Sequence, residues 1–441
     1  MKRRTSVELI VALLLSFSIL LFSAFKGIYI GYGITISLII FSILALKMGK
    51  TRDEILHSAW EGGKRAFVVL IIFFLIGLVT ASWLASGAIP ATVYYAMRIM
   101  DPRLFVVFAF ITTSLVSYML GTSLGTGATI GVVLIIMARS GDINLNLIGG
   151  AILAGCYVGD RASPMSSSAN LVSNLTGTKL YPMLKMFRKS TIVPLIISVF
   201  IYFLLSINNP LNTYGNTILS DIEEFFVINF WVLLPTLTML TLSILQINVR
   251  IAMLISIIIG SFIAIFMQNI EIIDFLKILI FGYKLEPTNP LVNIIKGGGL
   301  VSMVKPGYII FASCAMAGVL EKIGLFEKAY HLFKKIDSRA KLFLATAIAS
   351  LVSAAYGGNQ SIAVVMTIQL MKKVYEEHDV DNYELATDIS NTTILLSATI
   401  PWNIANFVIA NTLEVSPIKI VPYAFYLYIP LIYNYLVFRR K

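Results

Sequence analysis

The 441-residue sequence contains little of what soluble enzymes and metal proteins depend on. It has only 2 cysteines and 3 histidines, and only 13% of its residues are charged. The histidines fall in separate charged loops, so they form no zinc-ligand spacing. A GxSxG pattern at residues 121–125 has no histidine base near it, and no GxxxxGK[ST] phosphate loop occurs. We therefore expect neither an enzyme nor a transporter driven by ATP within this chain.

Long apolar runs take up most of the chain. Apolar residues make up 58% of the sequence, far above the proportion in soluble proteins, so we expect a polytopic membrane protein. Runs suited to crossing the hydrocarbon layer lie at residues 7–25, 28–46, 66–85, 104–120, 191–207, 226–245, 251–267, 308–320, 342–356 and 422–438. With two interrupted segments, residues 121–178 and 359–413, they predict an all-α fold of about 11 to 13 transmembrane segments.

Most basic residues behind the formal charge of +11 lie in short loops between these runs. One cluster precedes residue 7 and another follows residue 46, whereas residues 208–225 contain acidic residues and no Lys or Arg. Basic residues concentrate in cytoplasmic loops, so we expect a multi-pass protein of the plasma membrane with a cytoplasmic N-terminus. The charge is explained by membrane topology, and we expect no nucleic-acid partner.

A short pattern recurs in the two halves of the chain. Ser114-Leu-Val-Ser117 followed by Gly121 returns 236 residues later as Ser350-Leu-Val-Ser353 followed by Gly357. This shift predicts an N-terminal helix (1–27), a first repeat (28–207), a connector with an additional helix (208–249) and a second repeat (250–441). Loop charge favours opposite orientations, so we expect inverted repeats whose broken or re-entrant helices meet at the membrane midplane.

The segment at residues 155–170, GCYVGDRASPMSSSAN, interrupts an apolar run with polar residues. A carboxylate in the bilayer costs roughly 2.5 to 3.5 kcal/mol, so Asp160 is expected to face a cavity, a partner or a cation. Pro164 should break the helix and free carbonyl oxygens. The alternative is that Asp160 caps a helix at the interface or balances Arg161.

Hydroxyls and amides near Asp160 are candidate cation ligands, because alkali cations prefer hard oxygen atoms. In the first half they are Thr122, Ser123, Thr126, Ser163, Ser166, Ser167, Ser168 and Asn170. In the second half, ion or substrate ligands are expected at Asn359, Asn391, Thr392, Thr393, Asn403 and Asn406. The expected helix-breaking residues are Gly159, Pro164, Gly357, Gly358 and Pro401. The glycines at residues 121–131 also fit close helix packing, which is an alternative reading of that segment.

No acid of the second half matches Asp160. Asp388 lies nearer a loop, and solvation there is as compatible with the sequence as burial. The amides of Asn391, Asn403 and Asn406 can coordinate a cation or bind a polar substrate, but none can carry a proton. The sequence therefore predicts a single titratable group at the site.

These residues resemble the motifs of the NhaC family of sodium/proton antiporters. The resemblance rests on residues 121–123, 159–170, 400–403 and 422–425, together with the WxxSGxxP pattern at 83–90. Its segment GDRASPMSSSAN departs from a family pattern similar to GDKMSPLSDTTN, since Ser167 replaces an acid. An expected second-half acid is also replaced near Ser390 and Asn391. The resemblance implies secondary transport, and the missing acids put the family's proton stoichiometry in doubt.

We expect a secondary transporter that exchanges Na⁺ for H⁺ at Asp160, because one carboxylate can hold either ion in turn. The alternative within transport is a Na⁺- or H⁺-coupled carrier or exchanger of a small organic anion or an amino acid. A passive channel or a membrane-embedded enzyme is a third reading, and the absence of a nucleophile-base or metal set in the sequence argues against the enzyme. We expect no cofactor, with Na⁺ as the transported ion and lipid as the surroundings. The resemblance extends to the wider ion-transporter superfamily, and it implies a homodimer.

Overall fold

The computed structural model of this chain is built from helices, as the sequence predicts. It describes residues 2–141, 143–212, 218–245, 247–292, 294–324, 336 and 338–440. Within these ranges, nine helices are long and apolar enough to cross a membrane, or up to 11 if each of two bent pairs is one span. The sequence predicts 11 to 13 segments and the structure has 9 to 11 in the part of the chain that it describes, so the two agree only at 11. Two helices that carry site residues, α9 (Leu145–Ala162) and α19 (Gln360–Glu377), are not among the nine.

The helices up to the middle of the chain are α1 (Lys2–Lys26), α2 (Ile30–Lys47), α3 (Arg52–Lys64), α4 (Phe67–Ala85), α5 (Ala88–Ile99), α6 (Phe105–Leu120), α7 (Ser123–Thr126), the π-helix η2 (Gly127–Gly131), α8 (Val132–Ser140), α9, α10 (Ser167–Thr176), α11 (Leu180–Asn208), α12 (Ile218–Phe225) and α13 (Leu234–Ile244). Those that follow are α14 (Val249–Phe266), α15 (Ile272–Phe281), α16 (Val304–Ile323), α18 (Arg339–Gly357), α19, α20 (Asn382–Ile389), the π-helix η6 (Ser390–Ile394), α21 (Leu395–Ser397), α22 (Ile404–Thr412), α23 (Pro417–Ile420), the 3-10 turn η8 (Phe425–Leu427) and α24 (Ile429–Arg440).

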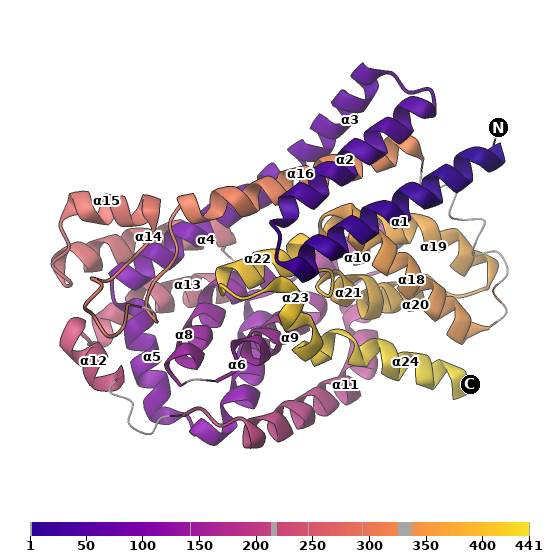
Figure 1. Cartoon of the computed structure of the whole chain (residues 1–441). Coiled ribbons are helices and arrows are strands. Elements are labelled where there is room, and N and C mark those ends of the chain that lie inside the picture. The colour runs from indigo at the N-terminus through magenta and orange to yellow at the C-terminus, as the bar shows by residue number, and fades with distance from the viewer. Residues whose placement is uncertain are drawn as a thin grey trace.

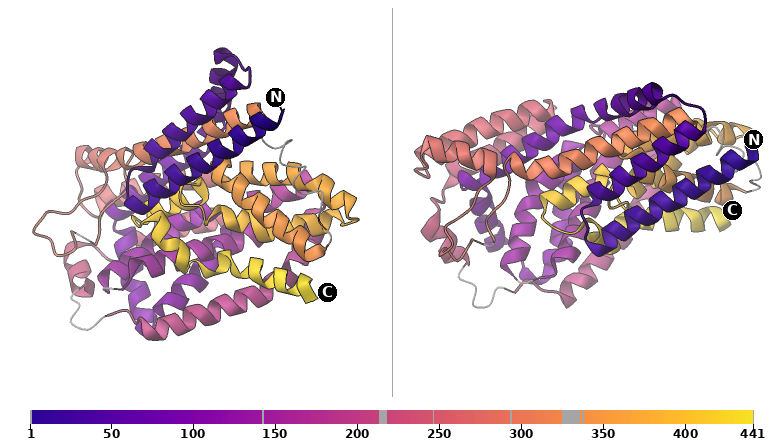
Figure 2. Two further views of the ribbon diagram at one scale, coloured as in Figure 1. Left: turned by 45° about the vertical axis from the view of Figure 1, so that its right-hand side comes forward. Right: turned by 45° about the horizontal axis from the view of Figure 1, so that its top comes forward.

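The helices form a central bundle with further helices along its sides (Figure 1). α16 packs against α2 and α3, and α1 packs against α2, so these four helices form one side of the molecule. α4, α13, α14 and α15 gather at the left of this view, and α6 and α18 lie lower, at the centre and at the right. α1 begins and α24 ends towards the same end of the molecule, as Figure 2 also shows.

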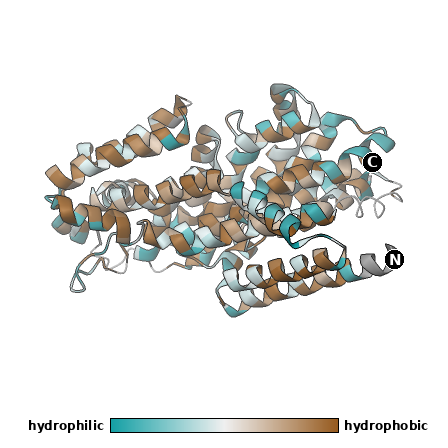
Figure 3. Ribbon diagram, turned by 90° about the horizontal axis from the view of Figure 1, so that it is seen from above, coloured by the Kyte–Doolittle hydropathy of each residue, from teal (hydrophilic) through white to brown (hydrophobic). Residues whose placement is uncertain are grey.

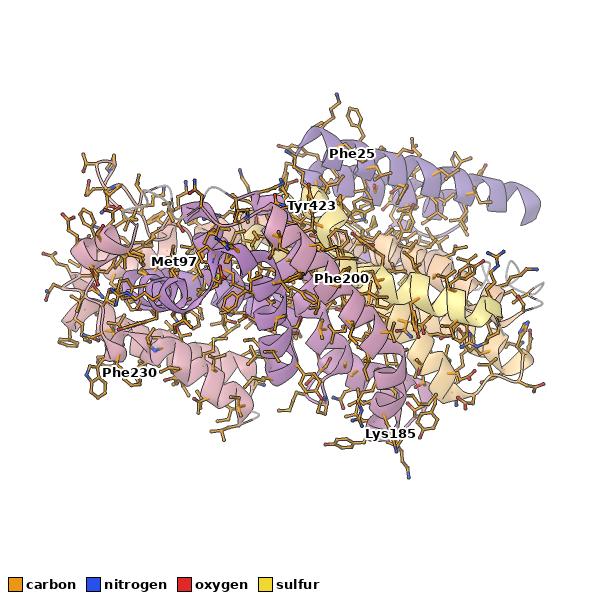
Figure 4. The ribbon with its side chains drawn as sticks, turned by 90° about the horizontal axis from the view of Figure 1, so that it is seen from below. Phe25, Met97, Lys185, Phe200, Phe230 and Tyr423 are labelled. Carbon is orange, nitrogen blue, oxygen red and sulfur yellow. The ribbon has the colours of Figure 1, made fainter. Side chains whose placement is uncertain are left out.

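The outer surface is apolar, as a lipid-facing surface must be. Figure 3 shows hydrophobic residues along most of the length of the helices. On α11, Phe200 is 59% exposed and projects from the middle of the helix, whereas Lys185 lies near one end (Figure 4). Large exposed apolar side chains of this kind recur on α1, α4, α14 and α18. The apolar faces therefore belong in lipid, and the polar residues of the interrupted segments lie inside the bundle.

The predicted repeat appears as a recurrence of helix starts, with an offset of 237 residues. The N-cap residues Thr122, Asn144 and Ser166 correspond in this way to Asn359, Asp381 and Asn403. The offset between the helix starts is one residue longer than the sequence shift of 236, because two glycines stand at the end of α18. The left-handed residue after α6, Gly121, therefore corresponds to Gly358 instead of Gly357. At this offset Pro164 and Pro401 coincide. The opposite orientation of the repeats in the membrane and the outer repeat boundaries stay predictions.

Two glycines let α9 lie directly against α6. A Cβ atom on Gly159 would lie 2.0 Å from the backbone carbon of Ser117, and one on Gly155 would lie 2.8 Å from the Cβ of Thr113. Gly159 sits inside α9, so the prediction that it breaks the helix is wrong; its role is close packing. The other expected breakers do lie at breaks, since Pro164 separates α9 from α10, Pro401 precedes α22, and Gly357 and Gly358 end α18.

We expect Gly159→Ala to lower the stability of the protein by about 3 kcal/mol, because overpacking against backbone forces two helices apart. The thermal unfolding midpoint of the purified protein in detergent measures this. Gly307→Ala is the matched control, since its added Cβ would make only ordinary contacts, with Leu70 at 3.4 Å and Phe74 at 3.9 Å. A midpoint for Gly159→Ala that equals that of the control would contradict the close packing of α6 and α9.

Candidate ion-binding site

Asp160 lies near the end of α9 and is only 3% exposed. Its Oδ2 accepts hydrogen bonds from Ser168 Oγ at 3.0 Å and from Gln360 Nε2 at 2.9 Å. Gln360 Nε2 also lies 3.2 Å from Ser168 Oγ, and the backbone N–H of Ser123 is close enough to stabilise the same carboxylate. Every one of these partners is neutral. The carboxylate is therefore held by polar groups of both repeats and has no cationic partner in the described ion pairs.

A cavity of about 830 Å³ opens beside Asp160, and both repeats contribute to its wall. Ten of its lining residues form pairs at the offset of 237 positions: Thr122 with Asn359, Ser123 with Gln360, Leu124 with Ser361, Ser167 with Ile404, and Ser168 with Ala405. The broken elements of the two repeats thus meet at one place, as the sequence predicts. Its location at the membrane midplane stays a prediction.

Four helices begin at this cavity. They start at Ser123, Ser167, Gln360 and Ile404, and the side chains of Thr122, Ser166, Asn359 and Asn403 accept a hydrogen bond from the first turn of each. A helix N-terminus carries a partial positive charge, which favours a negative group in front of it. The helix ends and the neutral donors therefore stabilise a carboxylate at Asp160 without a fixed cation beside it.

Of the predicted first-half ligands, only Thr122, Ser123, Ser167 and Ser168 line the cavity with Asp160. The others satisfy the backbone around the break. Thr126 donates to the carbonyl of Thr122, Ser163 accepts from Met165 N, and Ser166 donates to the backbone carbonyl of Asp160. Asn170 donates to the carbonyls of Ser166 at 2.8 Å and Pro164 at 3.3 Å. The carbonyl oxygen of Pro164 is therefore not free, and the prediction of free carbonyl oxygens is wrong at this residue.

In the second half, Asn359 lines the cavity, but the other predicted ligands do not. Asn403 caps α22 and donates to the carbonyl of Ala354 at 2.7 Å, and Asn406 donates to that of Pro417 at 3.1 Å. Thr392 and Thr393 bond with Ser350 at 3.1 and 2.7 Å, and Asn391 accepts from Arg161. These polar groups mainly hold helices together, because irregular backbone inside a bundle needs partners of its own.

Asp388 is buried, so of the two possibilities that the sequence leaves open for this acid, burial is the one that the structure has. Its Oδ2 lies 2.6 Å from Arg339 Nη1 and accepts from the Tyr375 hydroxyl at 2.6 Å. Arg339 also lies 3.5 Å from Glu384 and over the ring of Phe438. This carboxylate is neutralised by an arginine and lies outside the cavity, so it has the surroundings of a structural ion pair.

Gln360 is the site residue that sequence reasoning missed. It stands in the string GGNQS at residues 357–361, directly after the predicted ligand Asn359. The repeat register could have found it, since Gln360 corresponds to Ser123 at the offset of 237. Both are the first helical residues after a break, and both reach the Asp160 carboxylate.

Comparison with known proteins fits this geometry. The model of the Na⁺/H⁺ antiporter family matches residues 155–438. The chain is 29% identical over 415 residues to the Na⁺/H⁺ antiporter NhaC of Bacillus subtilis (strain 168), covering 92% of this chain and 91% of that protein. It is 24% identical over 426 residues to the malate-2H⁺/Na⁺-lactate antiporter of the same organism, covering 95% and 91%.

A further relative is the arginine/ornithine antiporter ArcD of Halobacterium salinarum (strain ATCC 700922 / JCM 11081 / NRC-1). The two are 25% identical over 385 residues, which is 86% of this chain and 79% of that protein. These relatives are antiporters, so they agree with the expectation of a transporter and not an enzyme. Because the family model covers well over half of the sequence, this chain belongs to the Na⁺/H⁺ antiporter family.

Proposed function

We propose that this protein exchanges Na⁺ for H⁺ across the membrane and that Asp160 carries the two ions in turn. The observation that supports the proposal is a nearly fully buried carboxylate that lines a large cavity and has only neutral partners. A buried carboxylate without a permanent counter-ion binds a proton or a cation strongly, because the bare charge is poorly solvated. Asp388 lacks this property because Arg339 already neutralises it.

The lining groups suit a hard cation. Ser168 and Thr122 offer hydroxyl oxygens, and the side-chain amides of Asn359 and Gln360 offer carbonyl oxygens if the amide of Gln360 turns about its terminal bond. Asp160 must release its proton to hold Na⁺, so a gradient of either ion drives the movement of the other. Coupling therefore needs one carboxylate and a bundle that exposes the cavity to each side alternately.

Asp160→Asn should reduce Na⁺-dependent proton flux in proteoliposomes to background, at least a hundredfold below the wild type. The amide keeps the shape of the side chain but cannot ionise, so neither ion can be carried. The control is Asp379→Asn, the same chemical change in an exposed loop, which should leave flux unchanged. Undiminished exchange by the Asp160→Asn protein would refute the proposed carrier.

Gln360→Met should lower stability by about 1 to 3 kcal/mol, since it removes a hydrogen bond between the two repeats at a carboxylate. The thermal midpoint of the purified protein reports this loss, and Ser361→Ala, a change at the next cavity-lining residue, is the control. The loss should shrink when Asp160→Asn is already present, because contacting residues are energetically coupled. Two losses that simply add would show that this contact contributes nothing.

A second candidate function is exchange of a small organic anion or an amino acid, as the names of two relatives describe for those proteins. The size and charge of the cavity favour it. About 830 Å³ is far more than one Na⁺ needs, and Arg65 and Arg250 line the cavity together with Asp160. The four helix N-termini add positive potential that suits a carboxylate group of a substrate.

Ligand-dependent thermal stabilisation separates the two candidates, because a ligand of the native state raises the unfolding midpoint. Na⁺ or Li⁺ should stabilise the wild type, by about 2.7 kcal/mol at a hundredfold excess over the dissociation constant, and should fail to stabilise Asp160→Asn. Malate, lactate, arginine and ornithine are the organic probes. Stabilisation by one of them that is lost in Arg250→Gln would support the second candidate, and stabilisation by none of them would exclude it for these substrates.

A further inference from the structure

Arg161 follows Asp160 on α9 and is completely buried. Its Nη1 donates to the hydroxyl of Tyr426 at 3.0 Å, and its Nη2 donates to Ser190 Oγ at 3.1 Å and to Asn391 Oδ1. Its guanidinium also lies 5.8 Å from the ring centre of Phe187. These partners come from three other elements, α11, η6 and η8, and all of them are neutral.

The positive charge of Arg161 is therefore uncompensated at short range. No ion pair among the described residues includes it, in contrast to Arg339, which contacts Asp388. Two donors in this cluster, Arg161 Nε and Asn391 Nδ2, are buried without an acceptor. A buried arginine is expensive to keep inside a membrane protein, and such residues usually serve function. Hydrogen bonding alone could be supplied by a neutral side chain at less cost.

We propose that Arg161 acts on Asp160 through its charge. It is a positioning residue whose fixed positive charge weakens cation binding at the neighbouring Asp160. The inference rests on the proposed function, in which Asp160 carries the cation. The guanidinium does not line the cavity, so it acts across the helix and does not touch the cargo. An arginine cannot lose its proton in a protein, so this charge is present in every step of the cycle.

The magnitude of the effect follows from Coulomb's law. Adjacent residues have Cα atoms about 3.8 Å apart, so the charges at the ends of their side chains lie on the order of 10 Å apart. At an effective dielectric constant of about 20, two unit charges at that distance interact strongly enough to change an affinity roughly tenfold. The direct partners of the carboxylate are neutral, so a fixed positive charge nearby loosens its hold on a cation, and transport requires that the ion leave on the other side. Arg161 thus keeps the bound ion exchangeable.

The test measures the KM for Na⁺ in proteoliposomes at alkaline pH, where protons compete least. Arg161→Gln removes the charge and should lower the KM for Na⁺ by about three- to tenfold and lower kcat, because release slows. Arg161→Lys keeps the charge and should keep the KM near the wild-type value. Ser190→Ala removes one neutral partner, leaves the charge, and should not move the KM.

Asn391→Asp is the decisive variant, because it leaves Arg161 in place and adds a carboxylate at contact distance. It has the size of the native side chain, so it tests the charge even if Arg161→Gln does not fold. We expect it to lower the KM for Na⁺ as Arg161→Gln does, and to shift the midpoint of Na⁺-dependent thermal stabilisation to lower Na⁺ concentration by the same factor. A purely structural arginine would give an unchanged or higher KM in both variants.

The two proposals fail in different ways. An unchanged or raised KM in folded Asn391→Asp protein overturns the role of Arg161, while Asp160→Asn would still abolish exchange. Retained exchange in Asp160→Asn instead overturns the proposed carrier, whatever Arg161 does. A lowered KM in Arg161→Gln and Asn391→Asp, with Arg161→Lys and Ser190→Ala unchanged, supports the inference.

Discussion

The hydrogen-bonded placement of the Asp160 carboxylate among four helix N-termini is the constraint on which the rest of this structure depends. A helix that begins inside a membrane protein leaves backbone N–H groups without partners, and each would be costly in an apolar interior. Thr122, Ser166, Asn359 and Asn403 satisfy part of this need as N-caps. The positive ends of the helices then favour a negative side chain in their midst. Broken helices and a buried acid thus stabilise one another.

Asp160, Arg161 and Asp388 are all buried, but their surroundings give the three charges different roles. Asp388 is paired with Arg339 and lies away from the cavity, so its charge is already balanced. Asp160 lines the cavity with neutral partners, so its charge is available to an exchangeable ion. Arg161 has neutral partners too, yet it is shielded from the cavity and cannot be compensated by the cargo directly. The difference between a structural and a functional charge here is the presence of a permanent counter-ion.

The two repeats match in the positions of their helix breaks but differ in the side chains that they bring to the cavity. Residues at equivalent positions of the two repeats line the same cavity, and the helix breaks coincide at Pro164 and Pro401. The position equivalent to Asp160 is occupied by Ser397, so only the first repeat supplies an acid at this place. The second repeat contributes Gln360 instead, which binds the acid of the first. One carboxylate shared between two repeats is consistent with a transporter that moves the repeats relative to each other around a single site.

The sequence by itself determined the class of the protein, the interrupted segments and the position of the acid. Apolar runs must lie in lipid and a lone aspartate among them must not, so hydropathy and one charge carry that information locally. Only the tertiary structure decided which polar groups are free to meet an ion. Asn391, Asn403 and Asn406 looked equal to Asn359 as ligands, but the folded chain uses their amides to satisfy helices and Arg161. It likewise paired Asp388 with Arg339 and brought Gln360 to Asp160 across 200 residues of chain. Hydrogen bonding between distant segments depends on their packing, and no local pattern of residues specifies that packing.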